Sequence, residues 1–146
     1  MARILVVDDD LLVANAIRML LENKGFEIFT ADGGEAGLNA LDAETFDLMI
    51  VDIFMPHMRG LESIRTFHRR APAIPLIAIS GYVFAERGMG APDFLRMALE
   101  LGAACCLRKP FLPATLLSAV AVSLAENVVG NNGSTIPVQG SMRAGA

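Results

Sequence analysis

Short apolar segments recur five times along the chain, and a stretch with helical spacing follows each one. The apolar segments are 3–8, 26–31, 46–52, 75–80 and 104–107, and the helical stretches are 11–25, 33–44, 60–71, 92–102 and 112–129. Several segments are apolar throughout instead of alternating, as strands of a parallel sheet are when both faces are buried. The pattern predicts an α/β fold: a doubly wound, five-stranded parallel sheet with helices on both faces.

Composition limits the classes of protein that the chain can belong to. With 146 residues, 53% of them hydrophobic, it is long enough for one domain with a real core. The net charge of −4 gives no electrostatic footprint for nucleic acid, and we expect no such partner. No apolar run approaches the roughly 18 residues of a membrane span, so no membrane association is expected.

The two ends of the chain and its cysteines add three expectations. From residue 130 the sequence is rich in Gly, Ser and Asn without periodicity, which predicts a domain over 1–127 and a flexible tail over 128–146 with no output domain. The apolar N-terminal stretch runs straight into three acids and is too short for a signal peptide. Cys105 and Cys106 are adjacent and have no other cysteine to pair with, which favours a reducing cytoplasm.

Polar residues stand at the ends of four of the five predicted strands. Open α/β sheets bind ligands outside the carboxyl ends of their strands, so these side chains should meet at one edge. They are Asp8, Asp9 and Asp10 after the first strand, Asp52 after the third, Ser80 after the fourth and Lys109 after the fifth. Clustered carboxylates repel one another unless a cation neutralises them, and oxygen ligands suit Mg²⁺. A metal, a nucleophilic carboxylate, a hydroxyl and a lysine are the parts for phosphoryl transfer to an aspartate.

Four motifs in this order resemble those of the response-regulator receiver domain, the CheY-like module of two-component signalling. They are "ILVVDDD", "DLMIVDIFMPHMRG", "LIAIS" and "LRKPF", and the resemblance covers about residues 1–127. It implies the flavodoxin-like strand order 2-1-3-4-5. It also implies a stand-alone phosphoprotein that a histidine kinase or phosphotransfer protein phosphorylates, and that then switches its contacts with a downstream protein target.

The resemblance also implies a role for each site residue. Asp52 would be the phospho-acceptor, and Asp8, Asp9, Asp52 and the backbone carbonyl of Phe54 would hold Mg²⁺. Ser80, Gly81 and Lys109 would contact the phosphoryl group, and the Lys109–Pro110 peptide bond would be cis. Such a chain is no enzyme beyond catalysing its own phosphorylation and dephosphorylation.

Three departures from the family pattern concern the switch and the output. Cys106 stands where the family usually carries Tyr or Phe, whose ring rotation is coupled to the Ser/Thr hydroxyl. The stretch "GYVFAERGMGAPDF" after Ser80 is longer than usual, with Gly88 and Gly90 as expected hinges. We expect no DNA-binding or enzymatic output domain. Cys106, Phe54 and Tyr82 are therefore expected modulators, and the two rings could shield the acyl phosphate from water.

Other interpretations of the same residues stay open. Taken singly, Asp8 or Asp9 could cap the following helix, a role that we assign to Asp10; Ser80 could be a turn residue and Lys109 a surface charge. We expect His57 and His68 at the surface and the two cysteines in strand packing. A degenerate receiver used as an unphosphorylated scaffold is one alternative, although no acid and no lysine is lost. An aspartate-nucleophile phosphatase of the haloacid dehalogenase type is another, but it needs an acid where Phe54 stands. The P-loop motif is absent.

The last helical stretch predicts a protein interface. Within 112–129 only Glu126 is charged, and Leu116, Leu117, Val120 and Leu124 share the face that should pack on the sheet. The opposite face carries Thr115, Ser118, Val122, Ala125 and Val129, where a solvated helix would show Lys and Glu. We expect this surface, formed by the fourth and fifth helices, to mediate a homodimer or another protein contact.

Overall fold

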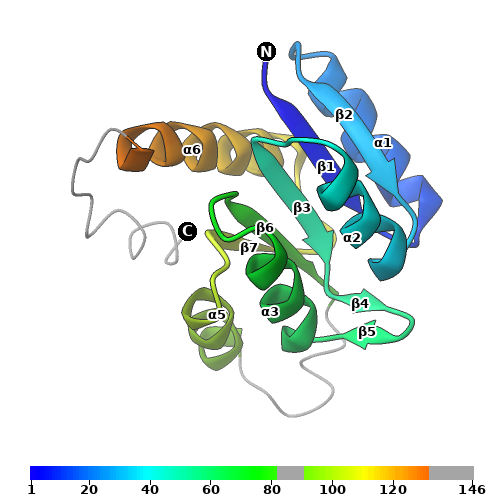
Figure 1. Ribbon diagram of the computed structural model, residues 1–146, viewed down its shortest axis with the longest axis vertical. Coiled ribbons are helices and arrows are strands. Elements are labelled where there is room, and N and C mark those ends of the chain that lie inside the picture. Colours follow the sequence, from blue (N-terminus) through cyan, green and yellow to red (C-terminus); the bar gives the residue numbers. More distant parts are fainter. Residues whose placement is uncertain (82–90, 132–146) are drawn as a thin grey trace.

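The computed structural model of the protein describes the backbone of residues 1–81 and 91–131 (Figure 1). The expected hinges Gly88 and Gly90, the proposed shielding residue Tyr82 and the tail from residue 132 onward lie outside these described residues. Within them, no helix combines the length and the apolar character that crossing a bilayer requires.

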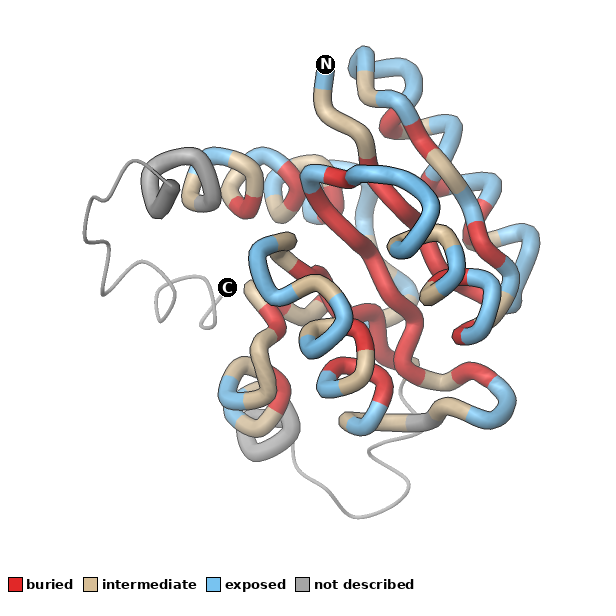
Figure 2. The backbone as a smooth tube through the Cα atoms, in the orientation of Figure 1, coloured by how far each residue is buried: buried red, intermediate tan, exposed pale blue. Residues whose placement is uncertain are grey.

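Five parallel strands form the central sheet, as the sequence predicts. They are β1 (Arg3–Val7), β2 (Glu27–Ala31), β3 (Leu48–Asp52), β6 (Leu76–Ser80) and β7 (Cys105–Arg108). Their order is β2-β1-β3-β6-β7, which is 2-1-3-4-5 when only these strands are counted. Every residue of β3 and β6 is buried, because helices cover both faces of the sheet (Figure 2).

The helices cover the two faces unequally. They are α1 (Leu11–Glu22), α2 (Gly34–Ala43), α3 (Leu61–Arg70), α5 (Ala91–Glu100) and α6 (Pro113–Asn131). Helices α1 and α6 pack on one face around Ile17, Leu21, Leu116 and Val120. Helices α2, α3 and α5 cover the other face, whose largest buried side chain is Phe67 (Figure 1). Helices therefore cover both faces of the parallel sheet, which confirms the doubly wound arrangement.

Local signals in the sequence explain where α1 begins and ends. The Asp10 side chain accepts hydrogen bonds from the backbone N–H groups of Leu12 and Val13, so its predicted role as N-cap is confirmed. After the helix, Gly25 adopts a left-handed conformation with φ of 92°, which glycine does at little cost. The chain then enters β2 beside β1.

A small antiparallel hairpin, β4 (Phe54–Met55) and β5 (Met58–Arg59), separates β3 from α3. The sequence indicated a turn at Pro56 and Gly60 but no strands, because two-residue strands leave no periodicity. His57 lies exposed at the tip with φ of 67°. Met58 packs against Gly34 so closely that a Cβ there would lie 2.8 Å from the Met58 Cε atom. The hairpin therefore packs against α2 beside the carboxyl end of the sheet.

His68 is not a surface residue, so that prediction was wrong. Its side chain is half-buried, and its buried Nδ1 atom has no hydrogen-bond partner among the described residues. The imidazole lies against Gly102, where a Cβ would come within 2.5 Å of the His68 Cγ atom. A pair made of one ring and one glycine leaves no periodic signal, because the two residues come from elements far apart in the chain.

Helix α6 confirms the predicted packing face and adds a polar residue to it. Leu116 and Val120 are fully buried, while Leu117 and Leu124 pack at the margin of the same core. Ser123 is also buried on this side, and within the part of the chain that the structure describes its hydroxyl has no hydrogen-bond partner. The helix extends to Asn131, past residue 127 where the sequence placed the end of the domain.

Candidate functional site

The carboxyl ends of the parallel strands bring the predicted polar residues together. Asp52 is the last residue of β3 and Ser80 the last of β6, while Asp8 and Lys109 follow β1 and β7 directly. The Asp8 N–H donates to the Ala31 carbonyl at 3.0 Å, and the Lys109 N–H donates to the Ser80 carbonyl at 2.7 Å. Sheet-like bonds therefore continue past the strand ends and fix the backbone from which these side chains extend.

Three carboxylates form one compact cluster. Asp8, Asp9 and Asp52 each offer an oxygen, and these atoms lie within 4.8 Å of one another. Asp8 is fully buried and Asp52 is 3% exposed, whereas Asp9 is exposed to solvent. The cluster is therefore closed on the side of the sheet and open toward Asp9.

Lys109 supplies the positive charge of the cluster. Its Nζ atom lies 3.3 Å from Asp52 Oδ2, to which it donates a hydrogen bond, and 3.2 Å from Asp8 Oδ2 as an ion-pair contact. The two remaining oxygens are held by backbone donors: the Asp10 N–H donates to Asp8 Oδ1 and the Phe54 N–H donates to Asp52 Oδ1. Both buried carboxylates thus have fixed orientations.

The protonation of the cluster reflects its burial. Burial is the main cause that raises the pKa of Asp8 to about 6, the neighbouring Asp52 charge raises it further, and the Asp10 N–H and Lys109 lower it. Burial alone would lower the pKa of Lys109, but Asp52 and Asp8 outweigh that effect, so its pKa is raised and the ammonium stays charged. One lysine therefore does not fully compensate the acids around it.

The donor set fits a hard divalent cation. Three carboxylate oxygens within reach of one another, one of them open to solvent, match the oxygen-rich, partly hydrated coordination that Mg²⁺ prefers. Asp8 Oδ2 is buried and shares the single Lys109 ammonium with Asp52 Oδ2, so a bound cation would add the positive charge that this pair of acids lacks. Asp8, Asp9 and Asp52 are accordingly the residues able to hold a metal.

The other predicted site residues lie around this cluster. Ser80 is buried at the end of β6, and Gly81 is half-buried beside Lys109. The Phe54 side chain is half-buried and packs in part against the core beneath the sheet. Cys106 is half-buried on β7. The Lys109–Pro110 bond is cis, as the sequence resemblance implies.

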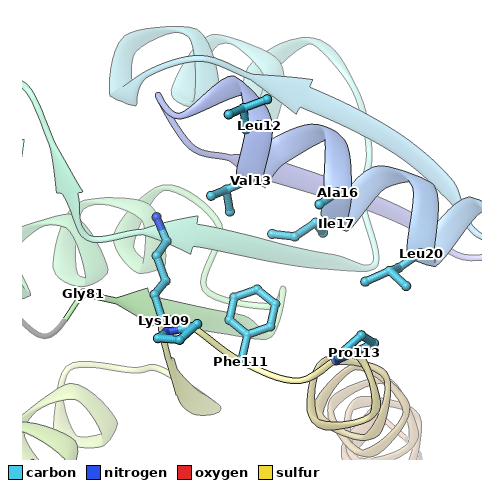
Figure 3. A pocket seen from close by; sticks show the side chains of 10 residues that line it. Leu12, Val13, Ala16, Ile17, Leu20, Gly81, Lys109, Phe111 and Pro113 are labelled. Atoms are coloured by element: carbon cyan, nitrogen blue, oxygen red, sulfur yellow. The ribbon is translucent and has the colours of Figure 1, made fainter.

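An apolar groove beside the site was not foreseen. It has a volume of about 660 Å³ and runs from Gly81 and Lys109 along α1 (Figure 3). Its walls are Leu12, Val13, Ala16, Ile17 and Leu20 from α1, and Pro110, Phe111 and Pro113 from the segment before α6 and its first residue. Leu12 fits the helical spacing of the core residues, yet 82% of it is exposed. The sequence did carry a signal for this exposed surface. Leu11 and Leu12 are adjacent, so both cannot lie on the face of α1 that packs on the core.

Comparisons with known proteins agree with this geometry. The family described as response regulator receiver domain matches residues 4–121. A probable transcriptional regulatory protein of Picosynechococcus sp. is 37% identical over 118 residues, which cover 75% of this chain and 44% of that protein. The chain spans about half the length of the curated relatives it matches.

Solved structures share the fold. A CheY-like receiver domain protein from Methanospirillum hungatei has 29% identity and a TM-score of 0.76, covering 88% of this chain and 97% of that one. The receiver domain dimer of NtrC4, described as activated by beryllofluoride, has 26% identity and a TM-score of 0.76, with 87% and 99% covered. Each likeness therefore takes in most of this chain and nearly all of the other one.

Proposed function

Because the chain belongs to the response regulator receiver domain family, we propose that it is a phospho-acceptor whose Asp52 carboxylate receives a phosphoryl group with the help of Mg²⁺. The observation that carries this proposal is the buried, oriented Asp52. One of its oxygens accepts from the Phe54 N–H, and the other lies 3.3 Å from the Lys109 ammonium. A carboxylate in this setting is presented to solvent from one side only.

Each residue of the cluster has a distinct part in the proposed reaction. An Asp52 oxygen attacks the phosphorus of a phosphohistidine; an O–P bond forms, and the N–P bond to the donor imidazole breaks. Lys109 neutralises one phosphoryl oxygen, and the Ser80 hydroxyl and Gly81 N–H donate to others. Asp8, Asp9, Asp52 and the Phe54 carbonyl would hold Mg²⁺, which supplies further positive charge to the transferred group.

Intact-mass spectrometry after incubation with acetyl phosphate and Mg²⁺ tests this proposal. The expected result is a gain equal to one phosphoryl group, which disappears when EDTA removes the metal. Asp52→Asn should show no gain, because an amide oxygen is a poor nucleophile. A scaffold that is never phosphorylated would show no gain in the wild type either, and that outcome would refute the proposal. We further propose a cytoplasmic location, in keeping with the two free cysteines.

The apolar groove supports a docking place for the phosphoryl donor. It starts at Lys109 and Gly81 and continues along α1 (Figure 3), so a donor seated there would bring its histidine to the rim of the site. Leu11 and Leu12 on α1 and Leu112 before α6 are each more than 60% exposed, at 63%, 82% and 70%. We propose that an apolar helix of the histidine kinase or phosphotransfer protein covers these side chains.

Two phosphoryl donors, a histidine kinase and acetyl phosphate, distinguish binding of the partner protein from phosphoryl transfer itself. Leu12→Glu should slow phosphorylation by the histidine kinases of the same genome but leave phosphorylation by acetyl phosphate unchanged. Lys24→Glu serves as the matched control, because it also changes charge just past α1 but lies away from the groove. Equal rates with kinase for both variants would exclude the groove as the docking place.

We propose that output passes through a surface formed by α5, β7 and α6, by homodimerisation or by contact with a target protein. Between β7 and α6 lies a groove of about 400 Å³ whose walls include Leu107, Thr115, Ser118 and Val122. Among the residues that the structure describes, β7 is an edge strand, and one side of its backbone has no neighbouring strand there. Val122→Lys adds a charge without touching the packed face of α6. Unchanged solution mass and unchanged target binding after phosphorylation would exclude this surface.

The proposed shielding of the acyl phosphate concerns its lifetime. Rings at Phe54 and Tyr82 that overhang the group would hinder the in-line attack of water. Replacing them together, as Phe54→Asn with Tyr82→Glu, should then speed the loss of phosphate from the isolated protein. Equal half-lives for wild type and variant would exclude shielding without affecting the assignment of Asp52.

A further inference from the structure

The first turn of α3 buries a polar side chain that the sequence patterns did not identify. Ser63 is fully buried, together with Ile64 and Phe67 of the core. A buried hydroxyl is costly unless it finds a hydrogen-bond partner. The Ser63 hydroxyl has one, because it donates to the backbone carbonyl of Met58 in β5 at 2.9 Å. This bond joins α3 to the β4–β5 hairpin.

Backbone hydrogen bonds close the same stretch of chain. The Gly60 N–H donates to the carbonyl of Ile53, just before the hairpin, and the Ser63 N–H donates to the Gly60 carbonyl at 3.1 Å. Gly60 has φ of 64°, a positive value that glycine adopts at little cost. The hairpin is thus closed at its base by the backbone and fixed to α3 by the Ser63 hydroxyl.

The hairpin carries backbone groups of the proposed site. Phe54, the first residue of β4, donates its N–H to Asp52 Oδ1 at 3.0 Å. Its carbonyl is the predicted backbone ligand of Mg²⁺. Phe54 pairs with Arg59, the neighbour of Met58, in the antiparallel register of the hairpin. A shift of β5 would therefore move the backbone of Phe54, and both groups with it.

We propose that Ser63 is a positioning residue for the phospho-acceptor site, because its bond to Met58 fixes the hairpin that orients Asp52. The same hairpin carries the Phe54 carbonyl, the predicted metal ligand. This inference rests on the proposed function. Ser63 acts through the hairpin, as residues behind metal ligands do when they fix the orientation of those ligands. Without the hydroxyl, the hairpin would spend part of its time in positions that do not bind Mg²⁺. The apparent affinity for the metal would then fall in proportion to the remaining competent fraction.

Serine variants separate positioning from stability. Ser63→Ala should weaken Mg²⁺ binding, measured by titration calorimetry, by roughly fivefold, the equivalent of one net hydrogen bond. Ser63→Thr keeps the hydroxyl and should stay near the wild-type affinity. Ser123→Ala is the matched control, because Ser123 is also a buried serine but its hydroxyl has no hydrogen-bond partner in the described part of the chain. It should bind Mg²⁺ as the wild type does. A purely structural role for Ser63 would lower the stability of Ser63→Ala without weakening this binding.

The decisive experiment measures amide hydrogen exchange by NMR in the full chain with EDTA present, so that its readout needs neither metal nor phosphorylation. Ser63→Ala should speed the exchange of the Phe54 amide by roughly fivefold or more. The Asp8 amide, which is bonded to the Ala31 carbonyl, should exchange as in the wild type, because the change is confined to the hairpin. Ser123→Ala should change neither amide.

Two results would overturn the positioning role while acetyl phosphate still phosphorylates Asp52. One is an unchanged exchange rate of the Phe54 amide in Ser63→Ala, and the other is equal Mg²⁺ affinity in Ser63→Ala and Ser123→Ala. Failure of acetyl phosphate to phosphorylate the wild type would instead overturn the proposed function, and the positioning role with it.

Discussion

Each end of the sheet places a cation among acids, but the two ends treat these charges differently. At the amino end, the Arg3 guanidinium contacts Glu44 at 2.9 Å and Glu27 at 3.4 Å, and its backbone N–H donates to Asp47. At the carboxyl end, the Lys109 ammonium lies 3.2 and 3.3 Å from Asp8 and Asp52. The distances are similar at the two ends.

Burial is what separates the two clusters. The Glu27 and Glu44 side chains are 52% and 46% exposed, whereas those of Asp8 and Asp52 are 0% and 4% exposed. Exposed charges keep their hydrating water, so the acids around Arg3 form ordinary surface ion pairs with it. The Arg3 guanidinium also lies over the rings of Phe29 and Phe46. Buried acids lose their water and are costly, so a cluster like that of Asp8 and Asp52 indicates a functional site.

The largest expected effect is on phosphorylation, and it should differ between the two ends of the sheet. Asp52→Asn should abolish phosphorylation by acetyl phosphate, because it removes the proposed nucleophile. Asp47→Asn is the same substitution at the other end of the sheet, and it should leave the yield unchanged. Intact mass after a fixed incubation measures both. If the Asp52 variant is phosphorylated to the same yield as the wild type, Asp52 is not the acceptor.

The second effect is on stability and on its dependence on pH. In the folded protein the pKa of Asp8 is raised from 3.8 to about 6, so ionising this group carries a folding cost that is absent below pH 4, grows as pH rises from 4 through 6, and is constant above that. That change corresponds to about 3 kcal/mol.

Asp8→Asn should therefore stabilise the metal-free protein by up to about 3 kcal/mol at pH 8, with a gain that shrinks toward pH 4. Urea unfolding in EDTA at a series of pH values measures this gain. Asp47→Asn should give no such gain, because its carboxylate is exposed. A gain for Asp8→Asn that is independent of pH would contradict the burial argument.

The third effect concerns the metal. Asp9→Ala should weaken Mg²⁺ binding by at least about tenfold, because a charged ligand is lost from a site held together by charge. Asp10→Asn preserves the helix cap and lies one residue further on, so it should bind Mg²⁺ nearly as wild type does. Titration calorimetry compares them. Equal affinities for Asp9→Ala and wild type would remove Asp9 from the proposed ligand set.

The smallest effect belongs to the exposed cluster. Arg3→Lys retains the charge but cannot contact Glu27 and Glu44 together or stack as a plane on Phe29. We expect a slight drop in thermal stability relative to the wild type. The drop should become smaller as salt screens the ion pairs, and phosphorylation should be unaffected. A large loss of stability would show that the amino-end cluster is as consequential as the buried one.

Most of the fold was predictable because it depends on periodic patterns. Five apolar runs and five helical stretches predicted the doubly wound sheet. The polar residues that end four of these runs predicted that Asp8, Asp52, Ser80 and Lys109 would lie at one edge of the sheet. The hairpin at 54–59 was missed because its strands have two residues each. The burial of His68 against Gly102 and of Ser123 in the α6 core depends on tertiary contacts that no local pattern encodes.

The groove on α1 shows a different limit. Spacing identified the apolar residues of this helix, but it did not separate the buried Ile17 from the exposed Leu12. That distinction depends on how the helix is rotated about its axis when it packs on the sheet.

The most direct test of the central claim is to locate the acyl phosphate on the chain. Sodium borohydride reduces an aspartyl phosphate to homoserine, which peptide mass spectrometry detects at a defined position. After treatment with acetyl phosphate and Mg²⁺, we predict homoserine at position 52 and at no other carboxylate. Homoserine at position 8, 9 or 47 in place of 52, or at none, would contradict the account.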